Sequence, residues 1–258
     1  MPGKLYNGND INSIPRPIKS DLKSRERIRE PEHPFRWSFM KILREYSTLK
    51  EFYPEINPYT ECYKVRDNTW ALYNDTFDGA GAVWMYLIDG PEKCMIVDTS
   101  FGVGDLKGLI RHLVGKKEII VVNTHAHFDH IVALDDLLKE YNVPIYYHNI
   151  NKELNYEKLI DVKEQEYKID NFIFSVIYTP GHRNDSVTYL FKDTMFTGDF
   201  LFHLSIGRTD MEYGNYNEMI ESIDKILEYS DNIDIYPGHG VSSNLGIEKR
   251  DNSFCIKE

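Results

Sequence analysis

The chain concentrates potential metal ligands in four short segments that lie far apart in the sequence. Each segment follows a run of apolar or β-branched residues, where a strand would end and a loop begin. The segments are residues 124–130 (THAHFDH), 179–182 (TPGH), 197–199 (TGD) and 236–240 (YPGHG). Divalent cations need several imidazoles and carboxylates that converge from separate strand ends. The sequence therefore predicts a fold that joins these four segments at one place.

The spacing of these residues divides the predicted ligands between two cations. Side chains two positions apart at a strand end point the same way, so the first two histidines could bind one cation. The next two ligands follow after the chain turns and could face a second cation. A carboxylate with two oxygens could bridge both. The predicted ligands are His125, His127 and His182 for the first cation, Asp129, His130 and His239 for the second, and Asp199 as the bridge.

Imidazole and carboxylate ligands suit zinc, and also iron or manganese. We therefore expect two divalent metal ions as cofactors, with Zn²⁺ as the first choice and iron or manganese as alternatives. Gly181, Gly198 and Gly238 precede three of the ligands and allow backbone turns that aim the next side chain.

The charge and composition of the chain limit the classes of binding partner that we expect. The 30 basic and 41 acidic residues give a formal net charge of −11, which disfavours nucleic acid because such binding neutralises phosphates with Lys and Arg. No apolar stretch has the length of a signal peptide or of a membrane span. The three cysteines form no CxxC pair and fit buried thiols in a reducing cytoplasm. We expect a cytoplasmic protein that acts on a small molecule, without nucleic acid or membrane partners.

Two regions are distinguished by their patterns. Residues 1–60, with mixed charges, are expected to be an N-terminal extension that packs on the core or on a partner subunit. A homo-oligomer is therefore a possible state of the protein. Residues 61–258 alternate strand-like and helix-like patterns and predict an α/β layered domain. The expected strands are residues 70–73, 82–88, 94–97, 118–122, 145–147, 172–177, 186–190, 194–197 and 233–236. The expected helices are residues 105–113, with Asp105 as the cap and Gly115 after the end, and residues 131–141, 152–159 and 216–229.

With these motifs, residues 65–245 resemble the metallo-β-lactamase superfamily of hydrolases. The resemblance implies a four-layer αββα sandwich, α+β layered, with the metals at one edge and a water or hydroxide that bridges them beside Asp199. The segment Val97-Asp98-Thr99 also looks like an aspartate site of this family. Asp98 would then accept a hydrogen bond that orients a ligand imidazole.

Within the superfamily, the sequence after the bridging aspartate is similar to the glyoxalase II group. The similar segments are residues 198–202 (GDFLF) and 205–210 (SIGRTD). The 19 residues after His239 do not include the C-terminal helical part of typical glyoxalase II enzymes or its glutathione-binding basic residues. An aspartate rather than a cysteine at position 199 argues against the best-known zinc β-lactamases.

The chemistry predicted for this site is a metal-dependent hydrolase of the thioesterase or lactonase type. A metal-bridging hydroxide would attack an ester, thioester or lactone carbonyl of a small molecule, and Asp129 would orient the nucleophile and shuttle its proton. The alternative is an oxygenase that resembles persulfide dioxygenases, with one Fe(II) held by His125, His182 and Asp199. Phosphodiester cleavage and a non-enzymatic sensor are further alternatives.

Several residues near the metal edge are candidates for substrate binding. Arg208 could bind a carboxylate in bidentate fashion, or it could form a salt bridge with Asp210. His203 could donate to an oxyanion, or it could be a plain loop histidine. The candidate substrate-binding residues are Arg208, His203, Asn184, Phe128 and Tyr73.

Overall fold

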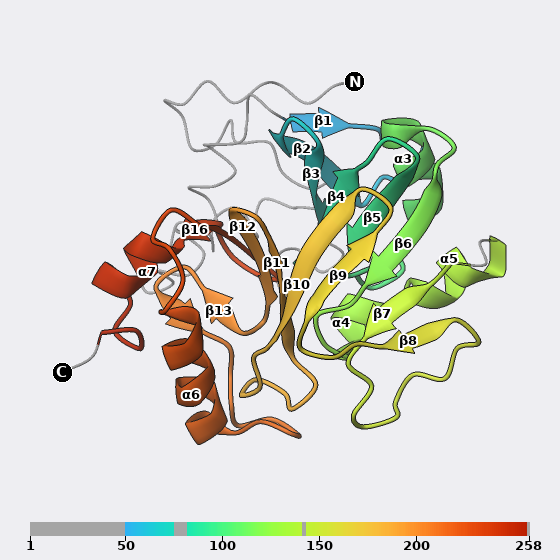
Figure 1. Ribbon diagram of the computed structural model, residues 1–258. Coiled ribbons are helices and arrows are strands. Elements are labelled where there is room, and N and C mark those ends of the chain that lie inside the picture. The colour runs from blue at the N-terminus through green and yellow to red at the C-terminus, as the bar shows by residue number, and fades with distance from the viewer. Residues whose placement is uncertain (1–49, 75–81, 141–142, 257–258) are drawn as a thin grey trace, which may run out of the picture.

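Two β-sheets packed face to face form the centre of the computed structural model, with helices on both outer sides (Figure 1). The structure describes residues 50–74, 82–140 and 143–256. Residues 1–49, most of the expected N-terminal extension, lie outside the described residues. Of the remainder of that extension, Lys50–Phe52 forms an edge strand that pairs with the next strand of the first sheet.

Within the described part of the chain, the first sheet has eight strands in the order of the sequence. The strands are β1 (Lys50–Phe52), β2 (Thr60–Arg66), β3 (Thr69–Asn74), β4 (Val83–Asp89), β5 (Lys93–Val97), β6 (Glu118–Val122), β7 (Ile145–Tyr147) and β8 (Leu159–Asp161). Strands β1 to β5 pair in antiparallel fashion, and β5 to β8 run parallel to one another. The carboxyl ends of β5 and β6 therefore lie side by side.

The second sheet has the order β16-β15-β12-β11-β10-β9. Its strands are β9 (Glu166–Ile169), β10 (Phe172–Tyr178), β11 (Val187–Phe191), β12 (Thr194–Gly198), β15 (Asp234–Pro237) and β16 (Ser243–Asn244). Strands β12 and β15 are parallel, and the other pairs are antiparallel. A separate short hairpin joins β13 (Leu201–Phe202) to β14 (Ser205–Ile206).

The helices cover the outer faces of the two sheets. Figure 1 shows α3 and α5 on the side of the first sheet and α6 and α7 on the side of the second. The helices are α3 (Leu106–Val114), α4 (Phe128–Ile131), α5 (Leu134–Glu140), α6 (Tyr216–Ile226) and α7 (Leu245–Asp251).

Three hydrophobic clusters correspond to the three interfaces between these layers. One lies between the sheets and includes Trp84 of β4 and Phe196 of β12. The second joins the first sheet to Leu109 of α3, and the third joins the second sheet to Ile223 of α6. Both faces of each sheet are thus covered, which explains why the central strands are apolar at nearly every position. The four-layer αββα arrangement expected from the sequence is confirmed.

The predicted signals at the ends of α3 are confirmed. The Asp105 carboxylate accepts a hydrogen bond from the Gly108 amide at 2.7 Å, and the Gly115 amide donates to the Arg111 carbonyl at 2.9 Å. These contacts satisfy backbone groups that a helix leaves without partners at its ends.

The helix predicted at residues 131–141 is wrong in its bounds, because it begins earlier and is interrupted. Helix α4 ends at Ile131 and α5 begins at Leu134. The His130 carbonyl accepts hydrogen bonds from the Thr99 amide at 2.8 Å and from the Asn123 side chain at 3.1 Å. Because donors from other strand ends engage this carbonyl, the chain does not continue as one helix.

Residues 152–159 do not form the predicted helix and instead lead irregularly into β8. The Asn149 side chain donates to the Leu154 carbonyl at 2.9 Å and accepts from the Leu154 amide at 3.4 Å. Lys152 has a φ of 57°, in the left-handed region. Such side-chain hydrogen bonds to the backbone compete with helix formation.

No helix in the described ranges is both long enough and apolar enough to span a bilayer.

Candidate metal centre

The predicted ligands lie on four loops or turns that follow strands of both sheets. His125 and His127 follow β6, and Asp129 and His130 belong to the short helix α4. The remaining ligands come from the second sheet. They are His182 after β10, Asp199 after β12 and His239 after β15. The structure brings all seven side chains into two adjacent groups with the division that the sequence predicts.

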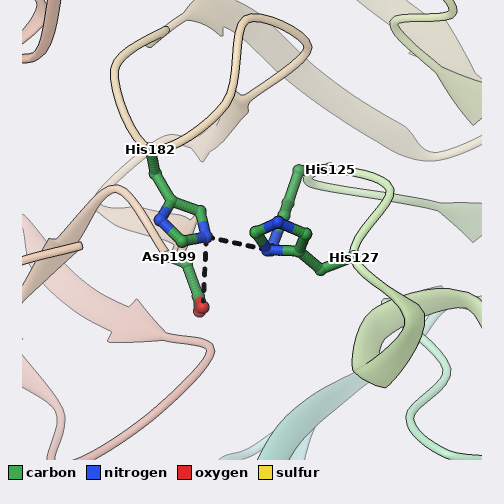
Figure 2. A group of neighbouring side chains, drawn as sticks. All are labelled: His125, His127, His182 and Asp199. Carbon is green, nitrogen blue, oxygen red and sulfur yellow. Dashed lines mark hydrogen bonds and ion pairs between the residues drawn. The ribbon is translucent and has the colours of Figure 1, made fainter. Parts of the chain in front are cut away.

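The first group consists of three imidazoles beside the Asp199 carboxylate (Figure 2). The Nδ1 atom of His127 lies 3.1 Å from His125 Nε2 and 2.9 Å from His182 Nε2. The Oδ2 atom of Asp199 lies 3.6 Å from His182 Nε2. The ligand atoms of this group all lie within 4.8 Å of one another. This spacing is suitable for several ligands that surround one ion.

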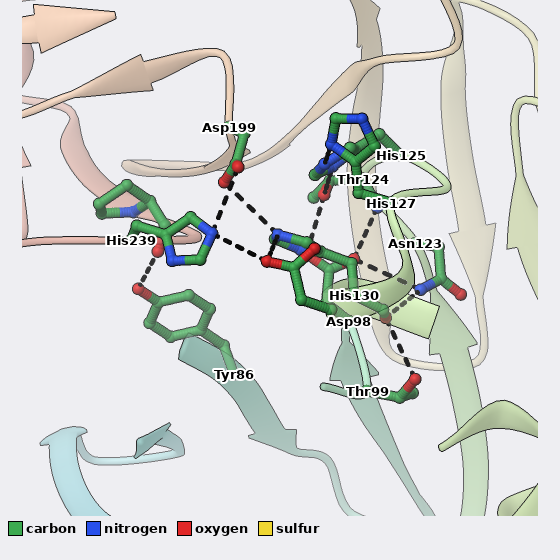
Figure 3. A network of polar contacts seen from close by, with 12 residues as sticks. Tyr86, Asp98, Thr99, Asn123, Thr124, His125, His127, His130, Asp199 and His239 are labelled. Carbon is green, nitrogen blue, oxygen red and sulfur yellow. Dashed lines mark hydrogen bonds and ion pairs between the residues drawn. The ribbon is translucent and has the colours of Figure 1, made fainter. Parts of the chain in front are cut away.

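The second group contains Asp129, His130 and His239. Figure 3 shows His130 and His239 of this group beside Asp199. His239 Nε2 lies 3.2 Å from Asp129 Oδ2 and 3.3 Å from Asp199 Oδ2. His130 Nε2 lies 3.5 Å from Asp199 Oδ1. The Asp199 carboxylate thus lies between the two groups, as a bridging ligand would.

Backbone carbonyls fix the tautomers of two ligands. His182 Nδ1 donates to the Arg208 carbonyl at 2.7 Å, and His239 Nδ1 donates to the Ala82 carbonyl at 2.6 Å. A carbonyl can only accept, so the proton must be on Nδ1 in both rings. When neutral, each ring then presents the lone pair of Nε2 to the interior of the site.

A side-chain network orients one ligand in each group. Asp98 accepts from His130 Nδ1 at 2.8 Å and from the Thr124 hydroxyl at 2.8 Å. The Thr124 oxygen in turn lies 3.0 Å from His125 Nδ1. Because the hydroxyl proton goes to Asp98, this oxygen accepts from His125. Asp98 therefore holds His130 directly and His125 through Thr124, as Figure 3 shows.

Some of the side-chain atoms that face the interior of the site lack hydrogen-bond partners and could bind a divalent cation. Among the described residues, His130 Nε2 and Asp199 Oδ1 are buried side-chain atoms without a hydrogen-bond partner. Buried polar atoms without partners are costly, and a cation would satisfy both. The donors are imidazoles and carboxylates, which suit zinc, iron or manganese.

Two glycines allow the ligand loops to approach each other closely. A Cβ at Gly238 would lie 2.5 Å from Asp199 Oδ1 and 2.6 Å from His130 Cε1. Gly198 has a φ of 51°, and a Cβ there would lie 2.4 Å from the Thr124 hydroxyl oxygen. A side chain at either position would overlap the site or the residues that orient it.

Burial favours the neutral form of two imidazoles in the first group, His125 and His127. It lowers the pKa of His125 well below the usual value, and the adjacent His130 lowers it further. Burial, His182 and Arg183 together lower the pKa of His127 to about 4. Neutral imidazole is the form that binds a metal ion.

The second group is more highly charged. Burial disfavours a proton on either histidine, but Asp199 and Asp98 outweigh it and raise the pKa of His130 well above the usual value. Asp199 and Asp129 likewise raise the pKa of His239 to about 10. These protons balance the carboxylates, and a divalent cation would supply the same positive charge.

Two of the candidate substrate residues have partners outside the ligand groups. The Arg208 guanidinium is exposed and paired with Asp210 at 2.9 and 3.0 Å, the salt bridge that the sequence offered as an alternative. His203 Nδ1 lies 3.2 Å from the Ser243 hydroxyl and 3.3 Å from Glu248 Oε1. Arg208 contributes to the site through its carbonyl, which orients His182.

The other three candidates differ in their access to solvent. Asn184 forms two reciprocal hydrogen bonds with Asn151, at 2.7 and 3.0 Å. Phe128 lies next to two ligands and is 65% exposed, with its ring against Phe101. Tyr73 is fully buried in the cluster between the sheets, so a substrate that enters from solvent cannot reach its ring without opening the core.

Sequence reasoning missed the residues that support the ligand loops. The histidine motif includes Thr124 but does not reveal its supporting contacts, and Asp185 is outside the predicted ligand set. Asp185 is three positions after His182 in a polar turn, which is a signal in the sequence. Its partner Tyr147 is on a strand of the other sheet, and only the tertiary fold brings the two together.

The family model of the metallo-β-lactamase superfamily matches residues 78–239, more than half of the chain. The chain belongs to this superfamily. It is 30% identical over 191 residues to the probable metallo-hydrolase YqgX of Bacillus subtilis, and the match covers 66% of this chain and 90% of that protein. It is also 34% identical over 158 residues to the hydroxyacylglutathione hydrolase GloC of Haemophilus influenzae, and that match covers 52% of this chain and 74% of that protein.

A solved structure shows the same fold. ETHE1 from Myxococcus xanthus has a TM-score of 0.61 and 26% sequence identity with this chain, and the match covers 70% of this chain and 83% of that one.

Proposed function

We propose that this protein is a binuclear metal-dependent hydrolase that cleaves an ester, thioester or lactone carbonyl of a small molecule. The observation that carries the proposal is the position of Asp199 between two sets of ligands. One carboxylate lies 3.3 to 3.6 Å from imidazole nitrogens of both groups. Membership in a superfamily with relatives named as metallo-hydrolases supports the same reaction class.

The ligand residues would hold the two cations in the predicted division. When bound, two divalent cations would lower the pKa of a shared water toward about 7 and polarise the carbonyl of the substrate. The lowered pKa values of His125 and His127 mean that these two imidazoles need no deprotonation before they bind a cation.

Asp129 is the residue to which we assign proton transfer. Its side chain is 17% exposed, and it contacts His239 Nε2 at 3.2 Å. Although burial opposes it, the hydrogen bond from His239 keeps the pKa of Asp129 below its usual value, so the group is a carboxylate at neutral pH. A carboxylate at this position can orient a water, accept its proton and pass the proton to the leaving group.

Metal analysis combined with a substrate panel tests this function. The panel contains thioesters, including a hydroxyacyl-glutathione because of the relative GloC, together with lactones, β-lactams and persulfides. We expect two zinc, iron or manganese ions per chain and turnover of at least one carbonyl substrate. Asp199→Ala should lose metal and turnover together. If that variant keeps two tightly bound ions and full turnover, the assignment is wrong.

A mononuclear Fe(II) oxygenase is the second candidate. The first group supports it, because His125 and His182 with the Asp199 carboxylate form a set of two histidines and one carboxylate. One iron per chain, with oxygen uptake on a persulfide, would favour this candidate. Two zinc ions without oxygen uptake would exclude it.

A further inference from the structure

We propose that Asp185 is a positioning residue for the first metal group and joins the two loops that carry its three histidines. This inference rests on the proposed metal centre and assigns a role to a residue outside the ligand set. Asp185 is fully buried in the turn that precedes β11, three positions after His182. Asp98 orients His130 directly, and Asp185 acts on the backbone and the charge around the other group.

The contacts of Asp185 reach both ligand loops. Its Oδ2 atom accepts the backbone amide of Ala126 at 3.1 Å, and Ala126 lies between His125 and His127. Its Oδ1 atom accepts Arg183 Nε at 3.0 Å, and Arg183 directly follows His182. One carboxylate therefore links the backbone between two ligands to the residue that follows the third.

A second set of contacts holds this carboxylate in place. The Tyr147 hydroxyl, on a strand of the first sheet, donates to Asp185 Oδ2. Arg183 also pairs with Glu153, and its guanidinium lies 5.1 Å from the centre of the Tyr213 ring. The loop that contains Glu153, where the sequence predicted a helix, thus braces the turn that carries His182.

Charge gives Asp185 a further effect on the same group. The Arg183 side chain is only 5% exposed, and it directly follows the candidate ligand His182. A buried guanidinium near a divalent cation would repel it, and the Asp185 carboxylate compensates that charge. Asparagine at this position would remove the negative charge that compensates Arg183. It would also replace one acceptor oxygen with an NH₂ group, which cannot accept the hydrogen bonds that surrounding groups donate to Asp185.

The experiment measures zinc affinity by competition with a chromophoric chelator, which gives two dissociation constants for the full-length protein. We expect Asp185→Asn to weaken one constant by about ten- to a hundred-fold, the range for residues that support metal ligands, and to leave the other within about three-fold. Diffraction at the zinc absorption edge, on crystals with limiting zinc, should locate the loss at the group of His125, His127 and His182.

Glu248→Gln is the matched control. Glu248 is equally buried and also accepts a backbone amide, from Leu204 at 2.8 Å. Its side-chain partners in the described part of the chain are His203, Ser243 and Asn252, and none of them is a candidate metal ligand. This control should lower the melting temperature and leave both zinc constants unchanged. Equal weakening of both constants by Asp185→Asn, or the same change in Glu248→Gln, would show a general structural role and overturn the inference.

Two further outcomes separate the failures. If the wild-type protein binds no divalent cation, the proposed function itself fails. If the wild type binds two ions and Asp185→Asn binds both with unchanged constants, only the inference about Asp185 fails. If Asp185→Asn does not fold, Tyr147→Phe decides, because it keeps the carboxylate and removes one of its donors. That variant should weaken the same constant by about three- to ten-fold, and an unchanged constant would overturn the inference.

Discussion

Asp98 accepts a hydrogen bond from His130 Nδ1 at 2.8 Å, and this hydrogen bond joins the end of β5 to a candidate metal ligand in α4. The same carboxylate receives the Thr124 hydroxyl, which supports His125. Both ligand groups therefore depend on one buried side chain that is not itself among the ligands.

Asp98→Asn should reduce metal affinity and turnover by about ten- to a hundred-fold. An amide offers one acceptor oxygen, whereas His130, the Thr124 hydroxyl and the Thr124 amide all donate to Asp98. Inductively coupled plasma mass spectrometry after dialysis, with steady-state kinetics, measures both effects. Thr124→Ser keeps the hydroxyl and serves as the control, with near wild-type metal content. Full metal content in Asp98→Asn would contradict the role of Asp98.

Gly238→Ala should abolish most activity and metal binding. Its Cβ would occupy space between Asp199 and His130, the region where the cations are expected. The matched control is Gly115→Ala, whose Cβ would meet nothing within 4 Å but whose φ is 78°. Backbone strain there should cost about 1–3 kcal/mol of stability and leave metal content unchanged. Thermal melts and metal analysis of both variants distinguish these effects, and reversed results would refute the account.

Tyr86→Phe should lower the free energy of unfolding by about 1–2 kcal/mol, because the buried Pro237 carbonyl would lose its donor. The Tyr86 hydroxyl donates to this carbonyl at 2.6 Å and so ties the first sheet to the loop that carries His239. Urea titration of the metal-free proteins measures the change. Tyr216→Phe, at a side chain that is 52% exposed, should change stability by less than about 0.5 kcal/mol. Equal effects of the two substitutions would contradict a stabilising role for the hydrogen bond between Tyr86 and Pro237.

The cysteine thiols should be inert in the native protein at pH 8. Burial raises the pKa of Cys94 and of Cys255 to about 12 and that of Cys62 still further. Ellman's reagent should label three thiols in urea and almost none in buffer. Rapid native labelling would contradict the buried positions.

The same shifts predict how stability depends on pH. A thiol in the unfolded chain ionises near pH ~8.5, whereas the folded protein keeps it protonated until about pH 12. The contribution of the protonated, buried thiol to the free energy of unfolding is therefore complete below pH ~8.5 and is lost as the pH rises toward 12. Urea midpoints at pH 8 and pH 10 should show lower stability at pH 10, and Cys94→Ala should reduce the difference. An equal or greater difference in that variant would contradict the assignment.

The sequence contains most of the information needed for the ligand set, because the ligands are local motifs at strand ends. The division into two groups follows from the turn after His127, and the structure has the same division. The layers also follow from local patterns, since strands covered on both faces are apolar throughout. Asp105 and Gly115 mark the ends of α3 with side-chain and backbone requirements that act within a few residues.

The errors and omissions depend on contacts between distant residues. Helix α4 ends early because Thr99 and Asn123 engage the His130 carbonyl, and no local pattern reveals those donors. The loop at residues 152–159 is held by Asn149 and by the pair of Glu153 with Arg183. Tertiary contacts of this kind override local helix preference.

Anomalous diffraction from crystals of the full-length protein grown with zinc, recorded on both sides of the zinc edge, tests the central claim most directly. The account predicts two peaks of similar height, one among His125, His127 and His182 and the other among Asp129, His130 and His239, with the Asp199 carboxylate between them. Zinc peaks only at other positions, with the seven side chains ordered around no ion, would contradict it.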